Sequence, residues 1–180
     1  MKRNTSSQWG TVAIGLHWLL AVLIIGQTVL GAAAEDAQVS PEKFDLFVWH
    51  KSLGVSILLL VLLRIAWRLT NPPPDLPAGL SSRDWQLARA GHCLLYALMI
   101  AVPLSGWVAS DSSRIPFRIF WSVPTPDLMA ANRDLSELAG EIHELLVIAL
   151  LLVVAGHVLA ALHHHFIRHN DVLRRMLPWR

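Results

Sequence analysis

Four long runs of apolar residues hold most of the hydrophobic side chains, and the charged residues lie almost entirely between them. The runs cover 11–34, 46–67, 85–109 and 139–165. A helix needs about 20 apolar residues to cross the hydrocarbon core of a bilayer, so each run is long enough to span a membrane. The chain has 180 residues, and four spans with their connections account for all of it. We therefore predict an all-α integral membrane four-helix bundle, a single membrane domain over 1–180.

The first run also has some features of a secretory signal peptide. Lys2 and Arg3 precede it, and Ala32, Ala33 and Ala34 end it. The apolar part of a signal peptide is typically about 7–15 residues long, and this run is longer. It also contains a histidine and leads into three further spans. We therefore interpret it as a retained transmembrane helix.

The distribution of Lys and Arg predicts the orientation of the spans. If the N-terminus is cytoplasmic, ten of the 15 basic residues lie on the inner side and five on the outer side. An excess of Lys and Arg in cytoplasmic segments is typical of membrane proteins. We therefore expect both termini to be cytoplasmic. The longest connection, 110–138, is then on the outer side, and we expect it to form a cap or a short interfacial helix.

Several classes of site are excluded by the residues that the chain lacks. Cys93 is the only cysteine, so the chain has no internal disulfide, no C-x-x-C-H motif for covalent haem and no thiolate-bound iron–sulfur cluster. The pair His143-Glu144 lacks the second histidine of the H-E-x-x-H zinc motif. No glycine motif indicates a nucleotide site, and we expect no nucleic-acid partner.

Histidine is the unusual residue of the spans. Five of the nine histidines lie inside the apolar runs and away from the 163–169 cluster: His17, His50, His92, His143 and His157. Ionisable side chains at membrane depth are costly and commonly functional. A neutral histidine that only hydrogen-bonds to a neighbouring helix is the structural alternative. Five histidines at two recurring depths favour a cofactor site.

Depth in the membrane pairs these histidines. His143 and His157 are 14 residues apart on the fourth span, which is about 21 Å of helix, and they share one face. At the matching depths lie His50 toward the outer side and His17 toward the inner side. Each pair could supply two axial imidazoles to a haem between facing helices. We predict haem irons ligated by His50 with His143 and by His17 with His157, an arrangement that favours electron transfer.

Glycines stand close to these histidines in the sequence. They are Gly15, Gly54, Gly91, Gly140 and Gly156. A porphyrin needs space beside its ligand helix, and glycine leaves that space because it has no Cβ. Close packing of membrane helices is the alternative reason for small residues.

Five stretches that contain the histidines carry a family resemblance. They are Ile14-Gly15-Leu16-His17-Trp18-Leu19, Trp49-His50-Lys51-Ser52-Leu53-Gly54, Ala90-Gly91-His92-Cys93-Leu94-Leu95-Tyr96, Glu141-Ile142-His143-Glu144, and Gly156-His157 with His164-His165-Phe166 and 170–178. With these residues the chain resembles the bacterial cytochrome b561 family, four-helix dihaem proteins of the inner membrane. The resemblance extends over nearly the whole chain. It implies two b-type haems held by His17, His50, His143 and His157 in a bacterial inner membrane.

The resemblance also implies an activity. The chain looks like the superoxide oxidase branch, an oxidoreductase that passes electrons from superoxide to ubiquinone. Related dihaem cytochromes are membrane subunits of hydrogenases and dehydrogenases, so the alternative is an electron relay for a partner protein. Under either reading the protein contacts membrane lipid and serves electron transport.

Basic residues near the two predicted haems are the further candidates for a functional role. On the outer side, Lys51, Arg114 or Arg118 could attract superoxide or hold haem propionates. On the inner side, Arg64 and Arg68 are the corresponding candidates for propionate or quinone contacts, and orientation of the helix is their alternative role.

Two more histidines lie close to the predicted inner haem. His92 is at the depth of His17 and His157, so three histidines compete for two axial positions. We favour His17 as the ligand and expect His92 to hydrogen-bond a propionate or a quinone oxygen. His164 is seven residues after His157 and shares its face, which makes it the candidate catalytic residue of the 163–169 histidine cluster.

Overall fold

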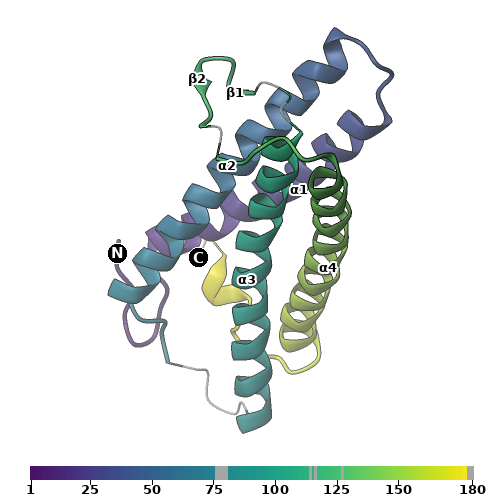
Figure 1. The fold of residues 1–180 in the computed structure, drawn as a ribbon. Coiled ribbons are helices and arrows are strands. Elements are labelled where there is room, and N and C mark those ends of the chain that lie inside the picture. Colours follow the sequence, from purple (N-terminus) through teal and green to yellow (C-terminus); the bar gives the residue numbers. More distant parts are fainter. Residues whose placement is uncertain (76–80, 114, 116, 127, 178–180) are drawn as a thin grey trace.

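Four long helices make up most of the molecule (Figure 1). The computed structural model describes residues 1–75, 81–113, 115, 117–126 and 128–177. The helices are α1 (Thr11–Asp36), α2 (Pro41–Thr70), α3 (Ser82–Ser112) and α4 (Arg133–Phe166). All four are long and apolar enough to cross a membrane. The fold is therefore the all-α membrane bundle that the four apolar runs predict, and each helix extends beyond its run.

Polar residues define where three of the helices begin. Ser40 precedes α2, accepts a hydrogen bond from the Lys43 backbone nitrogen, and is followed by a proline at the first helical position. Ser81 and Asp84 form a reciprocal capping box at the start of α3. Asn132 caps α4 through the Leu135 backbone nitrogen at 3.0 Å. Such caps satisfy the free N–H groups of the first turn, so the spans begin at defined residues.

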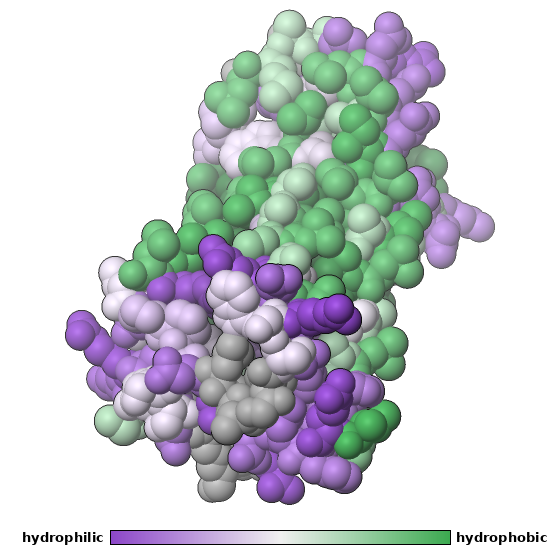
Figure 2. All heavy atoms as spheres, turned by 90° about the horizontal axis from the view of Figure 1, so that it is seen from below, coloured by the Kyte–Doolittle hydropathy of each residue, from purple (hydrophilic) through white to green (hydrophobic). Residues whose placement is uncertain are grey.

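The helices pack as two pairs, α1 with α2 and α3 with α4, and α2 joins the pairs through α3 (Figure 1). The buried core is small: Leu20, Ile57 and Val61 pack with partly buried side chains that include Tyr96 of α3. Many large apolar side chains are exposed instead. Figure 2 shows apolar side chains over the middle of the surface and polar ones gathered toward its two ends. This distribution suits a protein whose sides contact lipid.

One end of the bundle, the termini end, gathers three chain segments: residues 1–10, residues 71–75 and the tail after α4. Asn4 donates from Nδ2 to the carbonyl oxygens of Asn71 and Pro72, both at 3.0 Å. The Trp18 indole nitrogen donates to the Met176 carbonyl oxygen at 2.7 Å. The two termini therefore lie at the same end of the helices.

The opposite end, the hairpin end, carries two short antiparallel strands, β1 (Arg118–Ile119) and β2 (Val123–Pro124). The Phe120 backbone nitrogen donates to the buried hydroxyl of Ser52 at 2.8 Å. The Trp121 indole nitrogen donates to a carboxylate oxygen of Asp45 at 3.1 Å. These bonds fasten the connection to the side of α2. Between the end of α3 and the start of α4, the described residues form a hairpin and no separate helix, so the interfacial-helix alternative is wrong.

Candidate functional site

The five histidines of the spans meet in two groups. At the hairpin end, His50 of α2 and His143 of α4 have ring centres 6.2 Å apart. At the termini end, His157 of α4 has its ring centre 6.1 Å from that of His17 on α1 and 5.6 Å from that of His92 on α3. The structure thus brings together the histidines that were paired by their depth, His50 with His143 and His17 with His157. His92 lies beside the second pair.

The ring separations allow a test of whether a haem iron fits between these pairs. A bond from an imidazole nitrogen to a first-row metal is about 2 Å long, so two imidazoles on opposite sides of one metal have ring centres about 6.3 Å apart. His50 and His143 are at 6.2 Å, and His17 and His157 are at 6.1 Å. The ring separations of both pairs are therefore those of two imidazoles that bind one iron, whereas His92 and His157 are closer at 5.6 Å.

Two glycines allow the hairpin-end imidazoles to lie against neighbouring helices. A Cβ at Gly31 of α1 would be 2.8 Å from Cε1 of His50, and a Cβ at Gly106 of α3 would be 3.0 Å from Cε1 of His143. Carbon atoms in ordinary contact are about 3.5–4.0 Å apart. Each ring therefore occupies space that any other residue at these positions would fill.

The His143 ring has an anchored nitrogen. Its Nδ1 atom is 2.8 Å from the Val102 carbonyl oxygen and 3.2 Å from the Ser105 hydroxyl. A carbonyl oxygen can only accept, so Nδ1 carries the hydrogen and Nε2 keeps its lone pair. A histidine held in this way is prepared to bind a metal through Nε2.

The His50 ring has a different neighbour, the side-chain amide of Gln27 on α1. The amide nitrogen is 2.7 Å from the His50 carbonyl oxygen and 3.1 Å from His50 Nδ1. The amide oxygen, Oε1, is buried and has no hydrogen-bond partner among the described residues. Gln27 thus touches a proposed ligand directly.

Arg64 connects the termini-end histidines to a tyrosine. Its Nε donates to the Tyr96 hydroxyl at 3.0 Å, and its Nη2 lies 3.4 Å from Nδ1 of His17. The Arg68 guanidinium lies over the Tyr96 ring at 6.0 Å. Both arginines predicted for the inner side therefore reach the surroundings of this histidine group.

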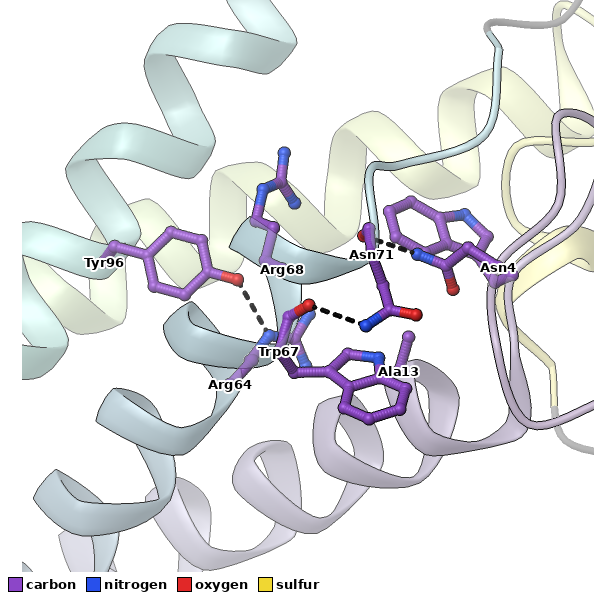
Figure 3. Close-up of a pocket in the computed structure, with 8 residues that line it drawn as sticks. Asn4, Ala13, Arg64, Trp67, Arg68, Asn71 and Tyr96 are labelled. Carbon is purple, nitrogen blue, oxygen red and sulfur yellow. Dashed lines mark hydrogen bonds between the residues drawn. The ribbon is translucent and has the colours of Figure 1, made fainter.

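A pocket lies beside this arginine–tyrosine contact (Figure 3). Figure 3 shows the Arg64 and Tyr96 side chains from neighbouring helices meeting at one side, with Trp67 and Asn71 at the other. The lining also includes Asn4, Trp9, Ala13 and Arg68. The Trp67 indole nitrogen is buried and has no hydrogen-bond partner among the described residues. The lining residues of the pocket include the donors Arg64, Arg68 and Trp67, but its volume of about 10 Å³ is close to that of a single water molecule.

The predicted catalytic cations of the other end lie near the hairpin. Lys51 is partly buried, next to His50 in the chain, with its ammonium 5.4 Å from the centre of the Phe117 ring. Arg118 is exposed and donates to the Ser122 carbonyl oxygen at 2.9 Å. Arg114 lies outside the described residues. Lys51 is therefore the candidate close to a histidine pair.

His164 lies at the termini end, away from Lys51 and Arg118. Its Nδ1 is 2.9 Å from the Asn170 side-chain nitrogen, which orients the ring. Across the parts of the chain that the structure describes, no three His, Cys, Asp or Glu side chains form a group that could hold a bare metal ion. The three predicted catalytic residues thus divide between the two ends of the bundle.

The glycines that contact the histidine rings, Gly31 and Gly106, are not among the five expected to leave room for a porphyrin, and that expectation stays a prediction. A Cβ at Gly15, Gly91, Gly140 or Gly156 would meet no atom within 4 Å, apart from its own surroundings in the helix. A Cβ at Gly54 would meet the Gln27 amide nitrogen at 3.4 Å. Sequence reasoning missed Gly31, Gly106, Ser105 and Gln27. Of these, only Gln27 carried a signal, because an uncharged amide inside an apolar span is itself costly.

Comparison with known proteins extends these observations. A family model described as prokaryotic cytochrome b561 matches residues 8–179. The chain is 31% identical to cytochrome b561 homolog 2 of Escherichia coli, over 97% of this chain and 93% of that one. It is also 31% identical to the probable superoxide oxidase CybB of Yersinia pestis, over 95% and 96%. Cytochrome b562 of Cereibacter sphaeroides is 26% identical over 91% of each chain.

These matches cover almost the whole chain and agree with the structure. Four apolar helices make the protein a multi-pass bacterial membrane protein, and the family implies binding of haem b. The histidine pairs provide imidazoles at separations that suit this cofactor. The chain therefore belongs to the prokaryotic cytochrome b561 family, whose members are b-type membrane cytochromes of electron transfer.

Proposed function

We propose that this protein is a dihaem superoxide:ubiquinone oxidoreductase of the bacterial inner membrane. The observation that carries the proposal is the pair of facing imidazole couples, which share α4 and lie about 21 Å apart along it. Haem b bound at both positions would supply reversible one-electron redox chemistry. The name of the Yersinia relative, probable superoxide oxidase, supports superoxide as the donor.

The ligands that we propose are His50 with His143 and His17 with His157. Each couple joins one helix of the α1–α2 pair to α4, so a planar cofactor would lie between the two helix pairs. His92 and His157 instead belong to α3 and α4, which pack directly on each other. This difference favours His17 over His92 as the axial ligand.

The hairpin end is the proposed donor side. Two superoxide anions each give up one electron and leave as dioxygen. Lys51 would attract the anion, since its ammonium is partly buried and follows His50 directly in the chain. Arg118 lies on the neighbouring hairpin and would add to the local positive charge.

The termini end is the proposed acceptor side. Ubiquinone would take up the two electrons and two protons to become ubiquinol. Arg64, Arg68, Tyr96 and His92 lie around the inner couple and could donate to quinone or propionate oxygens. His164, oriented by Asn170, is a candidate for proton delivery at this end.

The basic residues indicate which end of the bundle faces the cytoplasm. The basic excess of the N-terminal segment, the α2–α3 connection and the tail favours a cytoplasmic termini end. The hairpin end would then face the periplasm.

The test uses the purified protein reconstituted in lipid vesicles with ubiquinone. We expect two low-spin haems per chain in the visible spectrum and formation of ubiquinol when superoxide is generated outside. A preparation without haem would overturn the proposal. Two haems without superoxide-dependent ubiquinol would leave the relay alternative, in which a dehydrogenase or hydrogenase partner supplies the electrons.

A further inference from the structure

Gln27 contacts one of the two hairpin-end histidines and leaves one of its own polar atoms unused. Its amide nitrogen is within 2.7 Å of the His50 carbonyl oxygen and 3.1 Å of His50 Nδ1. Its Oε1 is buried without a partner among the described residues. A buried acceptor without a partner is costly, and such an atom in a native site calls for an explanation.

Metal binding by His50 would explain why Gln27 Oε1 has no partner in the described part of the chain. A neutral imidazole that binds iron through Nε2 carries its hydrogen on Nδ1 and must donate it. His143 already has an acceptor for that hydrogen, the Val102 carbonyl oxygen at 2.8 Å. His50 Nδ1 instead faces an amide nitrogen, which is itself a donor. The acceptor that His50 needs, Oε1, is on the same amide group.

We propose that Gln27 is a positioning residue that sets the reduction potential of the hairpin-end haem through His50. When His50 is ligated, the amide turns and moves away from the His50 carbonyl oxygen, so that Oε1 accepts the Nδ1 hydrogen and the amide nitrogen gives up its bond to that carbonyl. This inference rests on the proposed haem ligation by His50 and His143. The His50 carbonyl oxygen keeps its α-helical partner when the amide turns, because its helical bond comes from the Gly54 N–H.

The packing around the amide allows this contact. Gly54, one turn after His50, would bring a Cβ to 3.4 Å from the Gln27 amide nitrogen, and Gly31 would bring one to 3.1 Å from His50 Nδ1. Both positions lack that atom, so the amide and the ring meet directly. Partners of the second nitrogen orient a metal-bound histidine and increase its basicity.

We expect substitution of Gln27 to change the reduction potential of the hairpin-end haem and not that of the other haem. An acceptor at Nδ1 makes the imidazole a stronger electron donor, which stabilises oxidised iron and lowers the reduction potential. Gln27→Leu removes the acceptor and should raise the potential of the hairpin-end haem. Gln27→Glu, whose carboxylate can only accept, should lower it. A tenfold change in the one-electron equilibrium corresponds to about 59 mV, and we expect shifts up to this size.

The experiment is an optical redox titration of the purified, haem-loaded protein. His17→Ala, which we expect to keep the hairpin-end haem alone, identifies that haem's wave. Thr28→Val is the matched control, because Thr28 is the next residue and its hydroxyl donates within its own helix to the Ile24 carbonyl oxygen, its one hydrogen bond among the described residues. We expect opposite shifts of that wave in the two Gln27 variants, with the other wave and the control unchanged.

The outcomes separate this inference from the function on which it rests. A wild-type protein without two haems would overturn both. Two haems with unshifted waves in both Gln27 variants, or shifts in the same direction, would overturn the role of Gln27 alone. If Gln27→Leu loses the haem, the test rests on Gln27→Glu, which keeps the shape of the side chain. We expect a lowered reduction potential in that variant, and an unchanged potential would overturn the proposal.

Discussion

The Nδ1 atom of His143 lies 2.8 Å from the carbonyl oxygen of Val102, so one α3 carbonyl fixes the orientation of an α4 imidazole. Ser105 adds a hydroxyl at 3.2 Å, and this hydroxyl also donates to Val102 at 2.8 Å. The ring is therefore held through Nδ1, and no hydrogen-bond partner of Nε2 is found among the described residues. The close packing of α3 on α4 thus fixes one nitrogen of His143.

Gly106 and Gly31 should not tolerate alanine. A methyl group would come to 3.0 Å from His143 Cε1 in Gly106→Ala and 2.8 Å from His50 Cε1 in Gly31→Ala. Both helices are packed, so the ring must move, and we expect loss of about one of the two haems. Haem-to-protein ratio is the measurement. Gly26→Ala is the control, since its Cβ would meet nothing within 4 Å; equal haem in all three proteins would contradict the prediction.

The inner ligand is decided by comparing His17→Ala with His92→Ala. We expect the first variant to keep one haem and the second to keep two. Of the two pairs that share His157, His17–His157 joins the two helix pairs, and its ring separation of 6.1 Å suits two imidazoles on one iron better than the 5.6 Å of His92–His157. The measurement is haem content with the low-spin optical signal. One haem in His92→Ala and two in His17→Ala would reverse the assignment.

The sequence predicts the four helices and the pairing of the histidines because both depend on distance along a helix. Hydropathy locates the spans, and the 14-residue step from His143 to His157 places two rings at two depths. Direct side-chain contacts between helices could not be predicted in this way. Gly31 and Gly106 matter only because α1 and α3 present them to rings of other helices, which depends on packing. The hairpin also escaped prediction, since one of the bonds that hold it comes from Ser52, 68 residues before Phe120.

Ser52 should fasten the hairpin to α2. Its buried hydroxyl accepts from the Phe120 backbone nitrogen at 2.8 Å, and Ser52→Ala leaves that N–H to water or unpaired. The loss of such a bond costs about 1 kcal/mol, so hydrogen exchange at Phe120 should quicken about fivefold. Exchange measured by mass spectrometry over the hairpin tests this. Ser56→Ala removes a hydroxyl that bonds only within α2, at the Ser52 carbonyl oxygen, and should leave the hairpin unchanged.

Tyr96 should affect the quinone and not the haems. Tyr96→Phe removes the hydroxyl that accepts from Arg64 Nε at 3.0 Å and leaves the ring in the core contact with α1 and α2. We expect KM for ubiquinone to rise about tenfold or more at unchanged haem content, because a hydrogen bond to a charged group contributes about 1.5–3 kcal/mol. Met99→Leu, a packing change on the same helix, is the control. An unchanged KM would remove the Arg64–Tyr96 contact from the quinone site.

Lys51 should act on superoxide through local charge. Its ammonium is partly buried beside the Phe117 ring, and His50 precedes it in the chain, so Lys51→Gln removes positive charge next to the hairpin-end couple. We expect the rate of haem reduction by superoxide to fall about tenfold at low ionic strength, a modest value for electrostatic steering, and the difference from wild type to shrink as salt is added. Stopped-flow absorbance with a superoxide source measures this rate.

Lys43→Gln is the control, because it makes the same change of net charge at the α1–α2 turn, where the ammonium donates to the carbonyl oxygens of Glu35 and Ala37. Lys43 is seven residues, about 10 Å of helix, before His50, and its ammonium is held by backbone oxygens, so its removal should have a small effect. Equal rates in the two variants would show that net charge, and not a site at Lys51, governs the approach of the anion.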